Sequence, residues 1–417
     1  MNLNGGLTIS GTGRLNLEAT SSTSGASTVN VGGDFTSTGT STVVDWGTGT
    51  VTNNVINVTG NFTKSGTGTF TSASTSAATG FVFNKTGTQT FSYSGTNSDY
   101  TRYTVNSTST LQMLTGLTIS SLASPSSSLT INGTLDASTF TIAGGATNGA
   151  FTLASGATLK SANTNGVVSA TSGSISNTFA TATFNAAANY EFNGSAAQTT
   201  NFPSTVSIVN NLTINNSAAN VKIEKSITVN GNVIMSSGNL DLNGSFNITL
   251  GSTSSLNSET SAKAIINSGS PSAGNGWIGT SRTVNAPSAL NVANLGMTLT
   301  TASSMGTTFI KRFPKAISSV GTGNSISRHY SIAPTTQGTS ATVVLSYFDT
   351  ELNSNSETDP PMVEYNSTTE GSGYGLIGST AADATANTVT FTPTTISTTA
   401  TYWTLASSGF YYTTQAG

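Results

Sequence analysis

Residues 227–250, ITVNGNVIMSSGNLDLNGSFNITL, decide the fold class of this sequence. The stretch holds short runs of alternating apolar and polar residues, and Asn-Gly or Ser-Gly-Asn turns separate the runs. A period of two places apolar and polar side chains on opposite faces of a β-strand, and glycine supplies the positive φ angles of tight turns. We expect the inward residues to be Ile227, Val229, Val233, Leu240, Leu242, Phe246, Ile248 and Leu250, and the outward residues to be Thr228, Asn230, Asn239, Asp241, Asn247 and Thr249.

Similar strand and turn units recur along most of the chain. VNVGGDF at 29–35 and INVTGNF at 56–62 align at an offset of 27 residues, which matches Val31 with Val58 and Phe35 with Phe62. FVFNKTGTQT at 81–90 and YEFNGSAAQT at 190–199 share Phe-Asn and Gln-Thr at the same positions. One unit cannot bury its apolar face alone and needs neighbours stacked above and below it. We therefore predict a parallel β-helix, or β-solenoid, over residues 1–285.

The composition of the sequence changes near Leu290. From there the apolar runs are longer, and prolines and acidic residues are more frequent. Runs at spacings of about ten to twenty residues are typical of an antiparallel β-sandwich. We predict such a domain over residues 286–408, followed by a tail at 409–417. The expected strands are 295–310, 327–332, 341–348, 362–365, 388–391 and 402–405.

Composition excludes several classes of function. The chain has 417 residues, no cysteine and a net charge of −3, and only 7% of its residues are charged. Its 13 basic residues are scattered, so no patch could neutralise a run of phosphates, and we expect no nucleic-acid partner. No apolar run approaches the ~18 residues of a membrane-spanning helix, so we expect no membrane insertion. A chain poor in Lys and Glu and rich in Ser, Thr and Asn favours a secreted, extracellular or cell-surface protein.

Three phrases carry a resemblance to a known family: FNGSAAQTTNFP at 192–203, the run from Asn210 to Gly244, and GNSISRHYSIAPTTQGTSATVVLSYFDTELN at 323–353. In these phrases the chain resembles the repetitive surface proteins that bacteria export by type IX secretion. The resemblance implies a Ser/Thr/Asn-rich β-helix followed by a β-sandwich, with a role as an adhesin or a filament component and no catalytic motif. Members of the family usually end in a conserved sorting domain, whereas this sequence ends at Gly417, as we expect of a mature form.

Catalytic residue types are sparse. His329 is the only histidine, so a Ser-His-Asp relay or a His-based metal cage would have to include it. It lies in the strand pattern SRHYSI, and we expect it to be structural. The nine carboxylates of residues 1–280 lie at least ten positions apart. We therefore expect no enzyme activity, although acids and bases gathered on one solenoid face would favour a polysaccharide-active enzyme.

Acidic residues concentrate between positions 349 and 370. Carboxylates close in sequence can hold Ca²⁺, but their spacing matches no EF-hand loop. We expect a solvated acidic loop and no cofactor, with a calcium site as the alternative. Its ligands would be Asp349, Glu351, Glu357 and Asp359.

A β-helix has two ends at which backbone N–H and C=O groups lack partners, and these groups invite another strand. We expect the chain to join copies of itself head to tail, which would build an open homopolymer. The leading interpretation is thus an extracellular structural protein, a self-assembling fibre or surface-layer subunit. The alternatives are a cell-surface adhesin that binds glycan or a host or abiotic surface, through its sandwich or through Tyr93, Tyr100 and Tyr103, and the polysaccharide-active enzyme. The expected assembly interface contains Leu3, Leu7 and Ile9 at one end and Phe410, Tyr411 and Tyr412 at the other.

Overall fold

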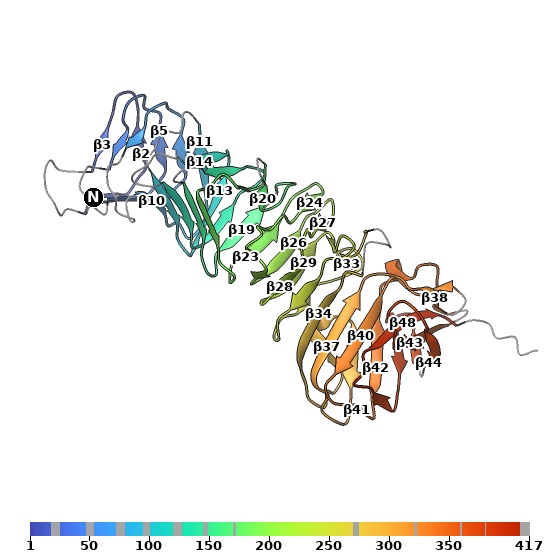
Figure 1. Cartoon of the computed structure of the whole chain (residues 1–417). Helices are drawn as coiled ribbons and strands as arrows, with labels where there is room; N and C mark the ends of the chain where they lie inside the picture. Colours follow the sequence, from blue (N-terminus) through green and yellow to red (C-terminus); the bar gives the residue numbers. More distant parts are fainter. Residues whose placement is uncertain are drawn as a thin grey trace, which may run out of the picture. The chain divides into compact units, whose positions relative to one another are not determined.

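The computed structural model describes residues 1–17, 26–46, 54–71, 80–94, 101–119, 127–144, 149–169, 172–269, 275–320, 323–358, 361–379 and 381–408. These residues form strands and turns, with short 3-10 helices at η2 (Val292–Asn294) and η3 (Asp349–Glu351). The chain divides into two compact units, Met1–Val221 and Lys222–Gly417. Figure 1 shows the strands of both units in sequence colours.

Unit 1 is a parallel β-solenoid, as predicted. In its two largest sheets the strands of successive coils pair in sequence order. One sheet contains β1 (Asn2–Leu3), β4 (Thr28–Val31), β7 (Val55–Val58), β10 (Gly80–Phe83), β12 (Arg102–Val105), β15 (Ser128–Ile131), β18 (Ala150–Leu153) and β22 (Thr181–Phe184). A second sheet contains, within unit 1, β2 (Leu7–Ile9), β5 (Phe35–Ser37), β8 (Phe62–Lys64), β11 (Gly87–Tyr93), β13 (Ser109–Met113), β16 (Thr134–Asp136), β19 (Thr158–Ser161), β23 (Asn189–Phe192) and β26 (Leu212–Asn215).

Shorter strands complete the coils of unit 1. They are β3 (Leu15–Asn16), β6 (Val44–Asp45) and β9 (Phe70–Thr71) in one sheet, and β14 (Leu117–Ile119), β17 (Ile142–Gly144), β21 (Ile175–Ser176) and β20 (Val168–Ser169) in another. Strands β24 (Gln198–Thr199) and β25 (Ile208–Val209) follow near the end of the unit.

The alignment at an offset of 27 residues is confirmed by the register. Val31 pairs with Val58, and Phe35 pairs with Phe62. The rings of Phe35 and Phe62 stack with their centroids 5.2 Å apart, and Phe91 extends the stack at 4.7 Å from Phe62. Phe91 follows Phe62 by 29 residues and still pairs with it. Stacked aromatic side chains in the core thus keep the coils in register although the coil length changes.

The glutamines shared by 81–90 and 190–199 lie at equivalent buried corners of two different coils. Gln89 accepts a hydrogen bond from the N–H of Lys85 and donates to two carbonyls of the preceding coil. Gln198 accepts from the N–H of Gly194 and likewise donates to two carbonyls, those of Ser161 and Asn163. Each amide therefore accepts from an N–H of its own turn and ties that turn to carbonyls of the preceding coil, which is the physical reason for the repeat.

Unit 2 begins with parallel pairs and continues with antiparallel ones. The parallel pairs are β28 (Ile227–Val229) with β31 (Ile248–Leu250), β31 with β34 (Ile278–Val284), β29 (Val233–Ser237) with β32 (Leu256–Asn257), and β30 (Leu240–Asp241) with β33 (Ile265–Ile266). Strand β34 also pairs antiparallel with β37 (Gly306–Phe313), so the pairing changes direction there.

Two larger antiparallel sheets follow in unit 2. From β37 the first continues through β40 (His329–Pro334), β48 (Thr401–Ser407), β43 (Met362–Ser367) and β44 (Gly375–Gly378). The second contains β35 (Leu290–Asn291), β36 (Met297–Thr300), β42 (Thr342–Ser346), β46 (Thr388–Phe391) and β45 (Ala381–Asp383). The small pairs are β38 (Ser318–Val320) with β39 (Gly323–Asn324) and β41 (Gly338–Thr339) with β47 (Thr395–Ile396).

Three details of the expected pattern are wrong. The run 295–310 is two strands, β36 and β37, because residues 301–305 turn the chain between them. Phe246 is only half-buried. Asp241, expected to face solvent, is fully buried. Its carboxylate accepts hydrogen bonds from the backbone N–H groups of Asn243 and Ser268, at 2.9 and 3.0 Å, and therefore caps a turn inside the coil.

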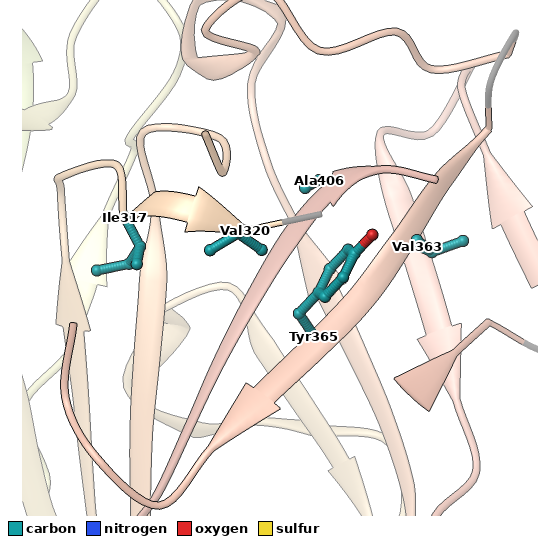
Figure 2. Packing of buried hydrophobic residues seen from close by; sticks show 5 residues of the cluster. All are labelled: Ile317, Val320, Val363, Tyr365 and Ala406. Atoms are coloured by element: carbon teal, nitrogen blue, oxygen red, sulfur yellow. The ribbon is translucent and has the colours of Figure 1, made fainter. Parts of the chain in front are cut away.

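Residues 317–320, which include strand β38, cover part of the outer face of β43 and β48. Figure 2 shows Ile317 and Val320 beside Val363, Tyr365 and Ala406, which form a small apolar cluster. This cover gives the antiparallel sheet a core on this side, at one end of its outer face.

Candidate functional site

The residues of the expected calcium site engage separate partners. Asp349 accepts a hydrogen bond from Asn387, Glu357 accepts one from Tyr347 at 2.7 Å, and Glu351 forms an ion pair with Arg328 at 2.8 Å. Asp359 lies outside the described residues. Within the described ranges, no group of three or more His, Cys, Asp or Glu side chains could together hold a metal ion.

A network of buried ion pairs lies in unit 2, and sequence analysis missed it. Arg312 donates to both carboxylate oxygens of Glu259, at 2.7 and 2.6 Å, and is only 1% exposed. Arg328 donates twice to Glu351, and its guanidinium lies 4.8 Å from the ring centroid of Phe348. Both arginines line a cavity of about 290 Å³. Each is committed to a carboxylate, so the network stabilises the fold rather than offering an open cation to a ligand.

The charge of Arg312 controls the ionisation of Glu259. Burial alone would raise the pKa of Glu259, but the charge and hydrogen bonds of Arg312, with help from Arg328 and the N–H of Ile265, outweigh burial and hold this pKa below its ordinary value. Glu259 is therefore ionised at neutral pH, and protonation at low pH would break the bidentate pair.

His329 is a buried, neutral side chain. Its ring stacks on Phe313 at 4.4 Å, and its Nδ1 lies 2.9 Å from the carbonyl oxygen of Lys315. Burial lowers the pKa of His329 to about 4. The stacking and the contact with Lys315 fit the structural role expected for it, and the ring has no acidic partner among the residues that the structure describes.

Glu364 carries a buried carboxyl group. Neither of its oxygens has a hydrogen-bond partner in the described part of the chain, and the side chain is fully buried. It faces the interior side of β43, directly opposite Leu405 and diagonal to Trp403. Burial raises the pKa of Glu364 to about 9, so the group is neutral at pH 7.

A short row of charges crosses one outer face of unit 1. The register places Asp136 beside Lys160 and Lys160 beside Glu191. Lys160 forms an ion pair with Glu191 at 2.9 Å, and Asn215 donates to the same carboxylate at 2.9 Å. Acids and a base thus meet on one face although they are far apart in sequence. Because Lys160 lies between the carboxylates, the row is a charge ladder across paired strands.

The first described coil of unit 1 has a side that no described strand covers, called here the uncovered side. Strands β1, β2 and β3 each lie at the end of their sheet and pair with one neighbour only among the described strands. Leu3, Leu7 and Leu15 are partly exposed there, and Ile9 is buried. A hollow of about 570 Å³ opens beside Leu15 and Met1. Of the expected interface, Phe410, Tyr411 and Tyr412 lie outside the described residues.

An asparagine ladder lies beside this uncovered side. Asn30 donates to the side-chain oxygen of Asn2 at 2.6 Å, and Asn57 donates to that of Asn30 at 2.7 Å. The three residues occupy one register position on β1, β4 and β7. The expected sugar platform of tyrosines is not exposed, because Tyr93 and Tyr103 are buried in the coil, while Tyr100 lies outside the described residues.

Comparison with known proteins gives no relative. No family model matches the chain, and no curated protein or solved structure matches it. No helix among the described residues is long and apolar enough to cross a membrane.

Proposed function

We propose that this protein is an extracellular structural subunit that assembles through the uncovered strands of its first solenoid coil. The C-terminal antiparallel sheets would form a β-sandwich domain on this subunit. The three sequence phrases that resemble repetitive surface proteins exported by type IX secretion also support this role.

The observation that carries the proposal is the uncovered side of β1, β2 and β3. Each strand has one neighbouring strand only among the described residues, and Leu3, Leu7 and Leu15 leave apolar surface beside this edge. Exposed strand edges of this kind are templates for pairing with another chain. The edges of β1, β2 and β3 surround one coil, so a second coil of the same cross-section could pair with all three at once. We therefore propose a second copy of this chain as the partner.

The asparagine ladder supports parallel, in-register stacking. Asn30 and Asn57 each donate to the residue of the preceding strand, and Asn2 ends the ladder in the described chain. An asparagine at the matching position of an added strand would continue the same side-chain hydrogen bonds. Ladders of this kind strengthen parallel stacks of strands.

The test compares two lysine substitutions on strand β2. Leu7→Lys places a charge at the apolar edge, whereas Thr8→Lys adds the same charge to the exposed outer face of the same strand. We expect the wild type and the Thr8→Lys variant to form assemblies that grow with concentration, measured by sedimentation velocity and negative-stain electron microscopy. The Leu7→Lys variant should remain monomeric. Monomers in all three samples would overturn the proposal, and so would equal assembly of both variants.

One structural feature bears on the alternative of a polysaccharide-active enzyme. It is the charge ladder of Asp136, Lys160 and Glu191. Acid–base hydrolysis of a glycosidic bond needs one carboxylic acid and one carboxylate flanking the bond. Here Lys160 lies between the two acids and pairs with Glu191. The ladder therefore favours a structural role over hydrolysis.

A further inference from the structure

We propose that unit 2 binds an acidic oligosaccharide on the outer face of its antiparallel sheet, across strands β34, β37, β40 and β48. The binding surface, called here the aromatic row, is separate from the uncovered coil of unit 1 and does not depend on assembly. It comprises Trp277, Phe309, Lys311, Ser331 and Tyr402, with Asn275, Lys315 and Glu370 along one side.

Strand register places the aromatic row in a line. Gly279 pairs with Lys311, Lys311 with Ser331, and Ser331 with Tyr402. With neighbouring strands ~4.8 Å apart, the row from Gly279 to Tyr402 spans about 14 Å. This length suits an oligosaccharide rather than a single sugar.

Aromatic rings occur at both ends of the row. At one end the Trp277 ring lies over Gly279, where an added Cβ would come within 3.1 Å of two ring carbons. Phe309 packs edge-on against Trp277 at 5.5 Å. Tyr402 lies at the other end, and all three rings are partly exposed. Rings that combine apolar faces with polar tips suit the mixed apolar and hydroxylated surface of a sugar.

Polar groups form a chain beside the row. Lys315 donates to the side-chain oxygen of Asn275 at 2.9 Å, Asn275 donates to Glu370, and the Tyr402 hydroxyl is hydrogen-bonded to Glu370 and Ser331. Donors and acceptors thus alternate along the row. A few placed polar groups among aromatic side chains are the usual composition of a ligand site.

The charge of the row selects an acidic glycan. Lys311 places its ammonium group 4.9 Å from the ring centroids of both Trp277 and Phe309, and no carboxylate of the described residues forms an ion pair with it. Lys311 and Lys315 against Glu370 leave one net positive charge on the surface. A carboxylate on a sugar ring could pair with Lys311 while the ring contacts the neighbouring aromatic side chain.

The test uses two ligands with the same sugar chain, tetragalacturonate and its uncharged methyl ester. Isothermal titration calorimetry on the full chain should show binding of the acid and at least about tenfold weaker binding of the ester. Lys311→Met keeps the aliphatic stem and removes the charge, so it should weaken binding of the acid to the level of the ester. The matched control is Lys85→Met, which removes an exposed lysine of unit 1 and should leave binding unchanged.

Two further readouts separate a binding role from a folding role. Tyr402→Phe keeps the ring and should weaken binding less than Tyr402→Ala, while circular dichroism shows that both variants fold. Raising the salt concentration should weaken wild-type binding and leave the Lys311→Met variant almost unaffected. Equal binding of acid and ester, unchanged binding by the Lys311→Met variant, or no binding by the folded wild type would overturn the proposal.

Discussion

Replacing the buried carboxyl group of Glu364 should make the protein more stable, and the gain should grow with pH. The group has no hydrogen-bond partner among the described residues, and burial raises its pKa to about 9 from an ordinary value of 4.5. Above pH 4.5 the unfolded chain releases this proton and the folded chain keeps it. Folding therefore loses stability as pH rises from about 4.5 towards 9.

The size of this effect follows from the pKa difference. Each pH unit above 4.5 lowers the free energy of unfolding by about 1.4 kcal/mol, so the penalty at pH 7 is about 3 kcal/mol. Glu364→Gln keeps the size of the side chain and removes the ionisation. We expect this variant to match the wild type near pH 4.5 and to exceed it by about 3 kcal/mol at pH 7.

Urea unfolding between pH 4.5 and 8, followed by tryptophan fluorescence, measures the difference. Trp403 faces the same interior as Glu364 and reports on this region. Glu364→Met serves as a second variant without charge or hydrogen-bond donors, and the pH dependence of its difference from wild type should be the same. A difference that stays constant with pH for both variants would show that Glu364 is ionised in the folded chain, and would refute the reasoning.

The remaining predictions concern other buried polar groups. Glu259→Gln should cost about 3–5 kcal/mol in urea unfolding at pH 7, because Arg312 would stay buried without its anion. Since the pKa of Glu259 is lowered, its contribution is present above its ordinary pKa of 4.5 and is lost as pH falls, so the variant should approach the wild type in acid. Gln198→Ala removes the buried hydrogen bonds of this amide, including the one that the N–H of Gly194 donates, and should cost about 2–4 kcal/mol, whereas Gln112→Ala, on the partly exposed outer face, should change thermal unfolding little. The buried ammonium of Lys64 lies 2.8 Å from the hydroxyl of Tyr93; Lys64→Met should leave the melting temperature equal or higher, and Tyr93→Phe should lower the free energy of unfolding by about 1–2 kcal/mol.

The solenoid could be predicted because its determinants are local and repeated. Alternation around Ile227 and Val229 assigns the inward face, and the match of Phe35 with Phe62 gives the register of one coil on the next. The sequence match also aligned the glutamines at positions 89 and 198, although their corners and hydrogen bonds became clear only in the structure.

The buried charges could not be predicted, because their partners are distant in sequence. Arg312 follows Glu259 by 53 positions, and only the antiparallel pairing of unit 2 brings them together. Asp241 looked like an outward residue because alternation cannot show that its carboxylate caps a buried turn. The aromatic row likewise depends on the register of four strands, which short sequence motifs do not specify.

Hydrogen exchange of the strand edges tests the proposed assembly most directly. Amide exchange of β2 (Leu7–Ile9) would be measured by mass spectrometry at low and high protein concentration, with the exposed outer strand residues of unit 2 as an internal reference. Pairing between copies predicts that β2 and its neighbours β1 and β3 become more protected at high concentration, while the Leu7→Lys variant shows no change. Equal exchange of β2 in the wild type at both concentrations, in samples that contain assemblies, would contradict an interface at the first coil.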